Sequence, residues 1–360
     1  MGDADMVHGG EPATLEARLP SQLPPLSSAQ HARALGSLVG AATGDALGAP
    51  YEFEPPIADS DDVAMIGGGE LGWGPGEWTD DTAMSIVVLQ VASEPRLGGV
   101  LTSRASLDAI AALWYRWSRE TIDIGTLTAT VLGEATMHAL SRAHRVPSGD
   151  DLRAAAQAVS ESRPSTAGNG ALMRVYATVL AYVRAPDDEL IRAVTTINTL
   201  THVDDDTVDA AVLWALAIRT AILTGHIDVR AGLRHIDPER RERWATLISE
   251  AEDAPPWFFR RNGWVIHAFQ GAYSAIHHAG DMPSDKFARR DFATRVFEGA
   301  VRAGYDTDTV ACIAGALAGA ALGYQAIKPE WRRELHGWPG YDLTELMALG
   351  ARVLEQANAC

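Results

Sequence analysis

The chain has 360 residues, of which 47% are hydrophobic and 21% charged, a composition typical of a globular protein that buries a large core. Its formal net charge of -17 argues against sequence-independent binding of nucleic acid, which needs a basic face, so no stable nucleic-acid partner is expected. The length is compatible with two or three domains or with one large helical domain. Cys312 and Cys360 have no metal-binding or redox spacing, which favours a reducing, cytoplasmic location.

Residues 1–28 are rich in Gly, Pro, Ser and acidic residues without periodicity, and we expect them to form a disordered tail. They show no basic region followed by an apolar stretch, so no signal peptide is expected. The most apolar segment, Thr309 to Tyr324, is shorter than a membrane span and reads as a buried helix. No membrane association is therefore predicted.

Residues 29–360 show helical spacing of apolar residues almost throughout, and we expect them to form one helical domain. No run of alternating β-branched residues bounded by turn signals interrupts this pattern. The predicted fold class is all-α. The clearest predicted helices are Ser106 to Glu120, Thr126 to Ala143, Asp150 to Ser160, Ala171 to Val183, Asp187 to Leu200, Asp206 to Thr224, Pro238 to Glu252, Gly263 to Ala279, Asp285 to Ala303 and Thr344 to Gln356.

Two helical segments carry glycine at every fourth position, the first at residues 36, 40, 44 and 48 and the second at residues 315, 319 and 323. Glycine inside a helix costs about 1 kcal/mol relative to alanine, so such a stripe needs a compensating reason. Close approach of two helix backbones is one such reason. We predict that these two helices lie side by side in the centre of the bundle, although Gly44 and Gly48 could instead belong to a loop.

Two acidic clusters, Thr79-Asp80-Asp81-Thr82 and Asp306-Thr307-Asp308-Thr309, each lead into an apolar, alanine-rich run. Asp and Thr are favoured helix caps, so either cluster alone is more often a cap than a set of ligands. A cap needs only one acceptor, however, whereas adjacent carboxylates repel each other unless a cation neutralises them. If folding joins the clusters, their oxygen ligands suit a pair of divalent ions such as Mg²⁺, Mn²⁺ or Ca²⁺.

Three further segments have features that point either to a ligand or to ordinary local structure. The glycine-rich run of residues 67–76 suggests backbone that approaches a ligand. The run Ser165 to Gly170 precedes a predicted helix, where its N–H groups could cradle an anion or simply form a turn. The triplet Asp204-Asp205-Asp206 resembles a third acidic site, but we interpret it mainly as a helix start.

The chain resembles the ADP-ribosylglycohydrolase family in an ordered series of motifs across residues 30–325. Together these motifs are strongly specific, although each alone is a modest signal. They are Gly40 to Glu52 (GAATGDALGAPYE), Trp78 to Thr82 (WTDDT), Asp123-Ile124-Gly125, Gly168 to Arg174 (GNGALMR), Thr201-His202 and Asp306 to Ala311 (DTDTVA). The resemblance implies a compact, single-domain orthogonal helical bundle with a central binuclear Mg²⁺ or Mn²⁺ site.

The resemblance also implies site residues. The expected ligands of the two metals are Thr79, Asp80, Asp81, Asp306, Asp308 and Thr309. Glu52, Asp80 and Asp308 are the expected catalytic residues, with Glu52 as general acid or base. The residues expected to contact ADP-ribose are Asp123, Gly125, Thr166, Ala167, Gly168, Asn169, Gly170, His202 and Tyr305.

Two positions depart from the family pattern. Tyr305 stands where the family commonly has Gly, and Ala167 replaces an aromatic residue found in some relatives. The expected activity is metal-dependent hydrolysis of the bond between ADP-ribose and an acceptor, an arginine or serine side chain of a modified protein, with ADP-ribose as product. Hydrolysis of ADP-ribose linked to nucleic acid or to a small molecule, and a non-catalytic ADP-ribose-binding role, remain alternatives. The acceptor side is expected among the loops at residues 253–262 and 328–341.

Overall fold

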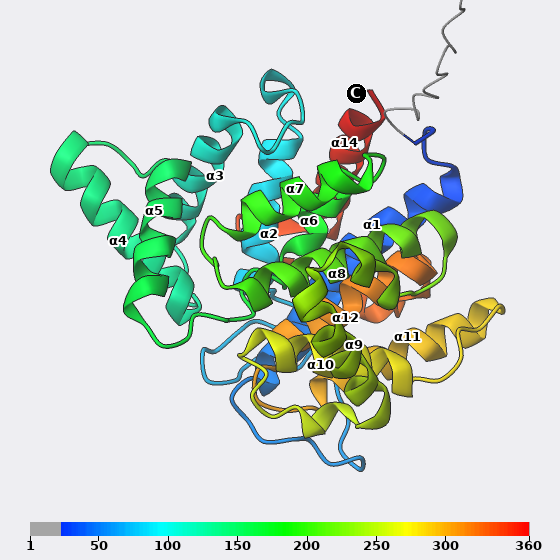
Figure 1. Ribbon diagram of the computed structural model, residues 1–360. Helices are drawn as coiled ribbons and strands as arrows, with labels where there is room; N and C mark the ends of the chain where they lie inside the picture. The colour runs from blue at the N-terminus through cyan, green and yellow to red at the C-terminus, as the bar shows by residue number, and fades with distance from the viewer. Residues whose placement is uncertain (1–22, 360) are drawn as a thin grey trace, which may run out of the picture.

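The computed structural model describes residues 23–359, and the predicted disorder of residues 1–22 lies outside them. The described chain is built of α-helices with short 3₁₀ turns, which confirms the predicted fold class (Figure 1). The α-helices are α1 (Ser28–Gly48), α2 (Asp80–Ala92), α3 (Arg104–Trp117), α4 (Thr126–Ala143), α5 (Gly149–Ser162), α6 (Val175–Ala181), α7 (Asp187–Asn198), α8 (Asp205–Thr224), α9 (Pro238–Asp253), α10 (Val265–His278), α11 (Lys286–Val301), α12 (Thr307–Leu322), α13 (Pro329–Glu334) and α14 (Leu343–Ala359).

The first helix begins at the boundary between the predicted tail and the predicted domain. Ser27 caps α1, because its side chain accepts the N–H of Gln30 while the Gln30 side chain accepts the N–H of Ser27. Just before it, the Leu23 N–H donates to the Arg184 carbonyl at 2.9 Å. The described part of the N-terminal segment is therefore attached to the helical body.

Helices α1 and α12 form the centre of the fold, as the glycine stripes predicted (Figure 1). A Cβ atom on Gly40 would lie 2.2 Å from the Gly315 carbonyl oxygen, and one on Gly44 would lie 2.0 Å from the Ala311 carbonyl oxygen. No side chain fits between backbones at that distance. The glycines therefore allow the contact that brings the C-terminal end of α1 to the N-terminal end of α12.

The remaining helices surround this pair. Helices α8, α10 and α11 pack on α12, whereas α3, α4 and α5 form a lobe at one side of the molecule (Figure 1). By length and composition α8 could span a membrane, but 78% of the relevant window is buried inside the structure. A buried apolar helix of this kind is typical of a protein core.

The region before α6 differs from the expected helix at residues 171–183. Residues 170–174 form turns, and α6 covers only residues 175–181. The N–H groups of Leu172 and Met173 both donate to the Asn169 carbonyl, and the Arg174 guanidinium donates to the Gly170 carbonyl. These bonds use the carbonyls of Asn169 and Gly170 as acceptors and hold the segment in a turn.

A two-stranded antiparallel hairpin, β1 (His336–Gly337) and β2 (Tyr341–Asp342), was not predicted. Each strand has only two residues, too few for alternation to be visible in the sequence. The hairpin packs beside the glycine-rich run, since the Trp78 N–H donates to the His336 carbonyl and the His336 N–H to the Gly76 carbonyl. Its position becomes important for a second cavity described below.

Candidate metal centre

The N-terminus of α2 is capped by a residue from another helix. Asp45, a buried residue near the end of α1, accepts the N–H of Thr79 at 2.8 Å and the N–H of Thr82 at 2.9 Å. The Thr79 side chain makes no cap hydrogen bond of its own. Because Asp45 caps α2, capping by Thr79 does not explain the first acidic cluster.

Side chains at the start of α2 contact side chains at the start of α12. The Thr79 hydroxyl lies 3.3 Å from both Asp81 Oδ2 and Asp308 Oδ2, and the Thr309 hydroxyl lies 3.3 Å from Asp81 Oδ2. Asp81 and Asp308 are 0% and 2% exposed. Two segments distant in sequence therefore share one buried set of oxygen atoms, as the sequence predicted.

The start of α12 likewise lacks a side-chain cap from Asp306. Asp306 Oδ2 instead accepts the Asn169 amide N–H at 2.8 Å, and its backbone N–H donates to the Asn262 side chain at 3.2 Å. Asn169 also donates to the Asn262 carbonyl at 2.8 Å. A network of two asparagines thereby fixes Asp306 beside the loop at residues 166–170.

Glu52 follows α1 and a short 3₁₀ turn, η1 (Ala49–Tyr51), which places it above the same cluster. Oxygen atoms of Glu52, Asp123 and Asp308 lie within 4.8 Å of one another, as do those of Asp45, Asp81 and Asp308. Asp308 is common to both groups. Asp80 completes this wall and accepts the Gly125 N–H at 3.2 Å.

The pKa values in the cluster are raised. Burial, followed by the charges of neighbouring carboxylates including Asp306, raises the pKa of Glu52 to about 9. Burial also raises the pKa values of Asp80, Asp81 and Asp308 well above their usual range. The causes are the burial of these carboxylates and their closeness to one another.

The donor set fits divalent cations. Three buried carboxylate oxygens, Glu52 Oε2, Asp81 Oδ1 and Asp308 Oδ1, have no hydrogen-bond partner among the described residues. None of the cluster's carboxylates forms an ion pair with Lys, Arg or His within the described part of the chain. Buried charges normally require pairing or a bound metal, and hard oxygen ligands suit Mg²⁺ or Mn²⁺.

A cavity of about 870 Å³ opens onto this cluster. Thirteen of the predicted site residues line it: Glu52, Asp80, Asp123, Gly125, Thr166, Ala167, Gly168, Asn169, Gly170, His202, Asp306, Asp308 and Thr309. Thr79 and Asp81 lie in the buried layer behind it. Tyr305, for which we predicted a ligand contact, is not among the described residues that line the cavity.

A series of contacts from Trp114 through Arg174 and Thr201 orients His202 at the cavity wall. Arg174, which lies over the Trp114 ring at 4.7 Å, donates to the Thr201 hydroxyl at 2.6 Å, and that hydroxyl lies 2.7 Å from His202 Nδ1. Because a guanidinium can only donate, Thr201 accepts from it and keeps its own hydrogen available, and we assign that hydrogen to Nδ1. The ring proton then resides on Nε2.

His202 is consequently a neutral donor that faces the turn at residues 168–170. Burial, together with the Arg174 charge, lowers its pKa well below the usual range. A Cβ atom on Gly170 would lie 3.3 Å from His202 Nε2, so the imidazole packs directly on this backbone. A ligand oxygen held at the turn would find the Nε2–H group beside it.

Of the two interpretations of residues 165–170, an anion cradle at a helix N-terminus or a turn, the structure has the turn, because α6 starts only at Val175. The turn is held against the segment before α10. The Asn169 N–H donates to the Gly263 carbonyl at 3.2 Å, and the Val265 N–H donates to the Ala167 carbonyl at 2.9 Å. The backbone N–H of Asn169 is therefore already engaged.

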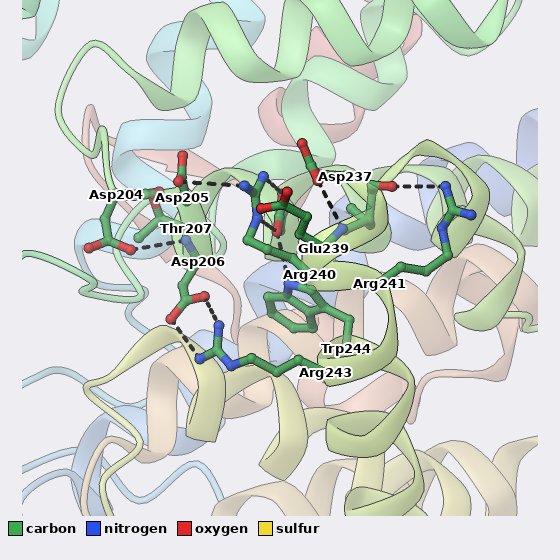
Figure 2. A network of polar contacts seen from close by, with 12 residues as sticks. Asp204, Asp205, Asp206, Thr207, Asp237, Glu239, Arg240, Arg241, Arg243 and Trp244 are labelled. Carbon is green, nitrogen blue, oxygen red and sulfur yellow. Dashed lines mark hydrogen bonds and ion pairs between the residues drawn. The ribbon is translucent and has the colours of Figure 1, made fainter.

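The third acidic triplet is the start of a helix, as interpreted from the sequence (Figure 2). Asp204 caps α8, with its side chain accepting the Asp206 N–H at 2.9 Å. Asp205 and Asp206 form ion pairs with Arg240 and Arg243 of α9. Asp205 and Asp206 are therefore neutralised by arginine, and Asp204 serves as the helix cap.

Two residues at the cavity were missed by the sequence analysis. Trp264 lines the cavity next to Ala167, and the Arg261 guanidinium lies 5.3 Å from the Trp264 ring centroid. Trp264 thus supplies an aromatic surface close to the position where Ala167 lacks one. Asp45 was also missed as the cap of α2, although a single carboxylate inside the apolar Gly40 to Gly48 run was a visible signal.

Comparison with known proteins places the chain among enzymes that remove ADP-ribose. The model of the ADP-ribosylglycohydrolase family matches residues 26–359. Over 316 residues the chain is 29% identical to an ADP-ribosyl-[dinitrogen reductase] glycohydrolase of Rhodospirillum rubrum, covering 85% of this chain and 90% of that protein. It is 27% identical over 302 residues to the ADP-ribosylarginine hydrolase Tri1 of Pseudomonas putida, covering 83% of this chain and 73% of the relative.

Two further relatives extend the comparison. The ADP-ribosylhydrolase ARH3 of Xenopus tropicalis is 26% identical over 340 residues, covering 84% of this chain and 91% of that protein. A solved structure described as an ADP-ribosylglycohydrolase-related protein complex superimposes with a TM-score of 0.65 at 26% identity, covering 92% of this chain and all of that one. The similarity spans the whole helical domain and is not confined to the acidic motifs.

Proposed function

The chain belongs to the ADP-ribosylglycohydrolase family of enzymes, and on that premise we propose that it is a metal-dependent hydrolase of protein-linked ADP-ribose. The bond cleaved is the glycosidic bond between ADP-ribose and an arginine or serine side chain, and free ADP-ribose is the product. The name of the Pseudomonas putida relative favours arginine as the first acceptor to test. We further propose that the enzyme works in the cytoplasm.

One observation carries the proposal. Carboxylates from α1, α2 and α12 converge on one buried cluster that contains oxygen atoms without partners among the described residues, and a large cavity opens onto it. A purely structural cluster of this kind would destabilise the fold by several kcal/mol, since unpaired buried charges are costly. Its retention beside the cavity is explained by binding of cations and substrate.

We propose that two divalent cations, Mg²⁺ or Mn²⁺, bind here. Their ligands would come from Thr79, Asp80, Asp81, Asp306, Asp308 and Thr309, with Asp308 contributing to both positions because it belongs to both compact oxygen groups. Bound cations would orient the hydroxyls of the distal ribose and make a water molecule more acidic. The tertiary structure prepares the ligands by satisfying the α2 N-terminus through Asp45.

Glu52 is proposed to transfer protons. Its carboxyl group lines the cavity, lies close to Asp123 and Asp308, and is not one of the proposed metal ligands. In its protonated form it would donate a proton to the leaving nitrogen or oxygen as the glycosidic bond breaks, and the resulting carboxylate would take a proton from the attacking water. Asp80 and Asp308, which border the same end of the cavity, would stabilise positive charge that develops on the ribose.

The rest of the cavity is proposed to bind ADP-ribose. The turn at residues 166–170 would hold the diphosphate, with His202 Nε2–H as donor and Arg261 at the rim as a positive charge. Asp123 and Gly125 would lie at the distal ribose, and Trp264 would offer its ring to the adenine. Arg163 and Arg261 are the positively charged side chains among the described residues that line this otherwise acidic pocket.

The proposal is tested by measuring free ADP-ribose released from matched arginine-linked, serine-linked and nucleic-acid-linked substrates. Each substrate is tested with Mg²⁺, with Mn²⁺ and with chelator, using the parent chain and Asp306→Asn. Asp150→Asn, an exposed change of the same charge on α5, serves as the control. Metal-dependent release from one linkage, lost only in Asp306→Asn, would support the proposal and identify the acceptor. Full turnover in chelator would overturn it, and ADP-ribose binding without release from any substrate would indicate a binding protein.

A further inference from the structure

A second cavity, of about 640 Å³, lies next to the first and is made by the two segments that the site above does not use. The glycine-rich run contributes Trp73, and the two residues after it contribute Glu77 and Trp78. The β1–β2 hairpin contributes His336, Gly337, Trp338, Gly340, Tyr341 and Asp342. The end of α3 and the residues after it close the third side. The glycine-rich run thus borders a cavity other than the one above the carboxylate cluster.

The linings of the two cavities include consecutive residues of the chain at two places. Thr79 lines the second cavity and its neighbour Asp80 lines the first. In the same way Ile122 lines the second cavity and Asp123 lines the first. The backbone at these two places therefore belongs to both sites.

The lining of the second cavity is aromatic and acidic. It presents Trp73, Trp78, Trp117, Trp338 and Tyr341 together with four carboxylates, and no Lys or Arg is among the described residues that line it. The combination of ring faces and carboxylates is complementary to a planar organic cation.

The carboxylates keep capacity for such a ligand. One oxygen of Glu77 accepts the Gly74 N–H at 2.8 Å, which orients the side chain, and its other oxygen has no hydrogen-bond partner among the described residues. Asp342 and Glu345 accept backbone N–H groups at the start of α14, each through one oxygen. Glu120 is committed elsewhere, to Arg116 and to the Trp338 indole. Because the side chains of Asp342 and Glu345 also contact each other, Glu77 is the least committed carboxylate of the cavity.

The indole groups that border the cavity are held by contacts of their own. Trp338 donates its indole N–H to Glu120 at 2.9 Å, and Trp78 donates its indole N–H to the Trp338 carbonyl at 3.1 Å, whereas the indole nitrogen of Trp73 is buried. The rings therefore offer apolar surface, and the guanidinium of an arginine side chain matches both these rings and the carboxylates.

We propose that this second cavity binds an unmodified arginine side chain of a protein partner. On the proposed function, the partner is the ADP-ribosylated protein itself, and the arginine flanks its modified residue. The cavity would then select acceptor proteins by local basic sequence. Binding of the arginine requires no ADP-ribose and is therefore measured separately.

The test uses the full chain with saturating Mg²⁺ and titrates N-acetyl-arginine-N-methylamide, following the fluorescence of the cavity tryptophans and the heat of binding. The matched probe is the citrulline analogue, which has nearly the same shape and no charge. The variants are Glu77→Gln and Trp338→Leu in the cavity. The controls are Glu134→Gln, an exposed change of equal charge on α4, and Glu52→Gln in the first cavity.

We expect saturable binding of the arginine probe, weakened roughly three- to tenfold in each cavity variant and unchanged in both controls. The citrulline probe should bind at least several-fold more weakly. Glu77→Gln keeps the acceptor for the Gly74 N–H, so it tests the charge even if Trp338→Leu does not fold. Equal binding of the two probes, or loss of arginine binding only in Glu52→Gln, would overturn the proposal. Neither outcome depends on ADP-ribose hydrolysis.

Discussion

The backbone N–H of Phe53 donates to the carbonyl oxygen of Tyr305 at 2.7 Å, and the Tyr305 N–H in turn donates to the Glu54 carbonyl at 2.7 Å. Both Phe53 and Tyr305 have positive φ, 69° and 63°. Each stands next to a carboxylate of the centre, since Glu52 precedes Phe53 and Asp306 follows Tyr305. This pair of bonds therefore fixes Glu52 relative to Asp306 through backbone conformations that are unfavourable for most residues.

The positive φ of Tyr305 leads to the first prediction, because glycine, the residue that the family resemblance led us to expect here, adopts this conformation without strain. Tyr305→Gly should change the free energy of unfolding by less than about 1 kcal/mol, since relief of strain offsets the added chain entropy. Tyr305→Val should lower it by about 1–3 kcal/mol, because a β-branched residue is strained at φ 63°. Urea unfolding measures both. Equal stability of the two variants would contradict the role assigned to this backbone.

The contact of α1 with α12 predicts an unusually costly Gly→Ala change. Gly40→Ala should lower the free energy of unfolding by more than about 3 kcal/mol or prevent folding, because its Cβ would lie 2.2 Å from the Gly315 carbonyl oxygen. Gly133→Ala in α4 is the control, since a Cβ there meets no atom within 4 Å. That control should gain about 0.5–1 kcal/mol. Thermal unfolding of purified variants distinguishes the two, and a mild effect at residue 40 would contradict the close packing.

Removal of one buried carboxylate should separate metal binding from folding. Asp308→Asn should fold, and without added cation it should be at least as stable as the parent, because one uncompensated buried charge is gone. Adding Mg²⁺ at 100 times its dissociation constant should stabilise the parent by about 2.7 kcal/mol and the variant far less. Differential scanning calorimetry measures both, with Asp150→Asn as control. An equal response of Asp308→Asn to Mg²⁺ would exclude Asp308 as a ligand.

The chain of contacts from Arg174 to His202 predicts the state of an imidazole. In the parent, ¹⁵N chemical shifts should show neutral His202 with its proton on Nε2 at pH 7, because Thr201 donates to Nδ1 and burial lowers the pKa. Thr201→Val should remove this preference, leave an Arg174 donor unpaired and cost about 1–3 kcal/mol of stability. Thr201→Ser keeps the hydroxyl and should behave as the parent does. A proton on Nδ1 in the parent would contradict the assignment.

An ion-pair group far from the cavity predicts a defined pH dependence of stability. Burial raises the pKa of Asp187, but hydrogen bonds from Arg219, Arg234 and His235 outweigh it and lower the pKa to about 2. Because the folded-state pKa lies below the unfolded value of 3.8, the stabilisation is present above pH 4 and is lost as the pH falls towards 2.

Asp187→Asn should therefore lower the free energy of unfolding by about 2 kcal/mol at pH 7, with the difference shrinking between pH 4 and pH 2. Urea unfolding at several pH values measures this. Asp188→Asn is the control, because Asp188 is exposed in the same turn and forms no ion pair within the described residues. A constant difference across this pH range would indicate that the effect of Asp187 does not come from its charge.

The sequence by itself determined where most helices form and which kinds of side chain gather at the candidate metal centre. Thr126–Ala143 is a helix with the predicted bounds, since the periodicity of apolar residues within a helix is a local property. The pairing of α1 with α12 was predictable as well, because a repeated glycine inside a helix is explained only by a neighbour that comes very close. The two acidic clusters could also be recognised in the sequence, because a helix cap needs one oxygen acceptor and each cluster offers several.

Only the tertiary structure decided which of these groups act together. Asp45 caps α2 and frees Thr79 and Asp81, an arrangement that depends on the path of α1 across the fold. The turn before α6, the role of Tyr305 through its backbone and the second cavity beside the hairpin all arise from contacts between segments remote in sequence. A local sequence pattern predicts helices and caps, which depend on residues a few positions apart. The contact partners of a residue and the cavities of the fold depend on packing between segments remote in sequence.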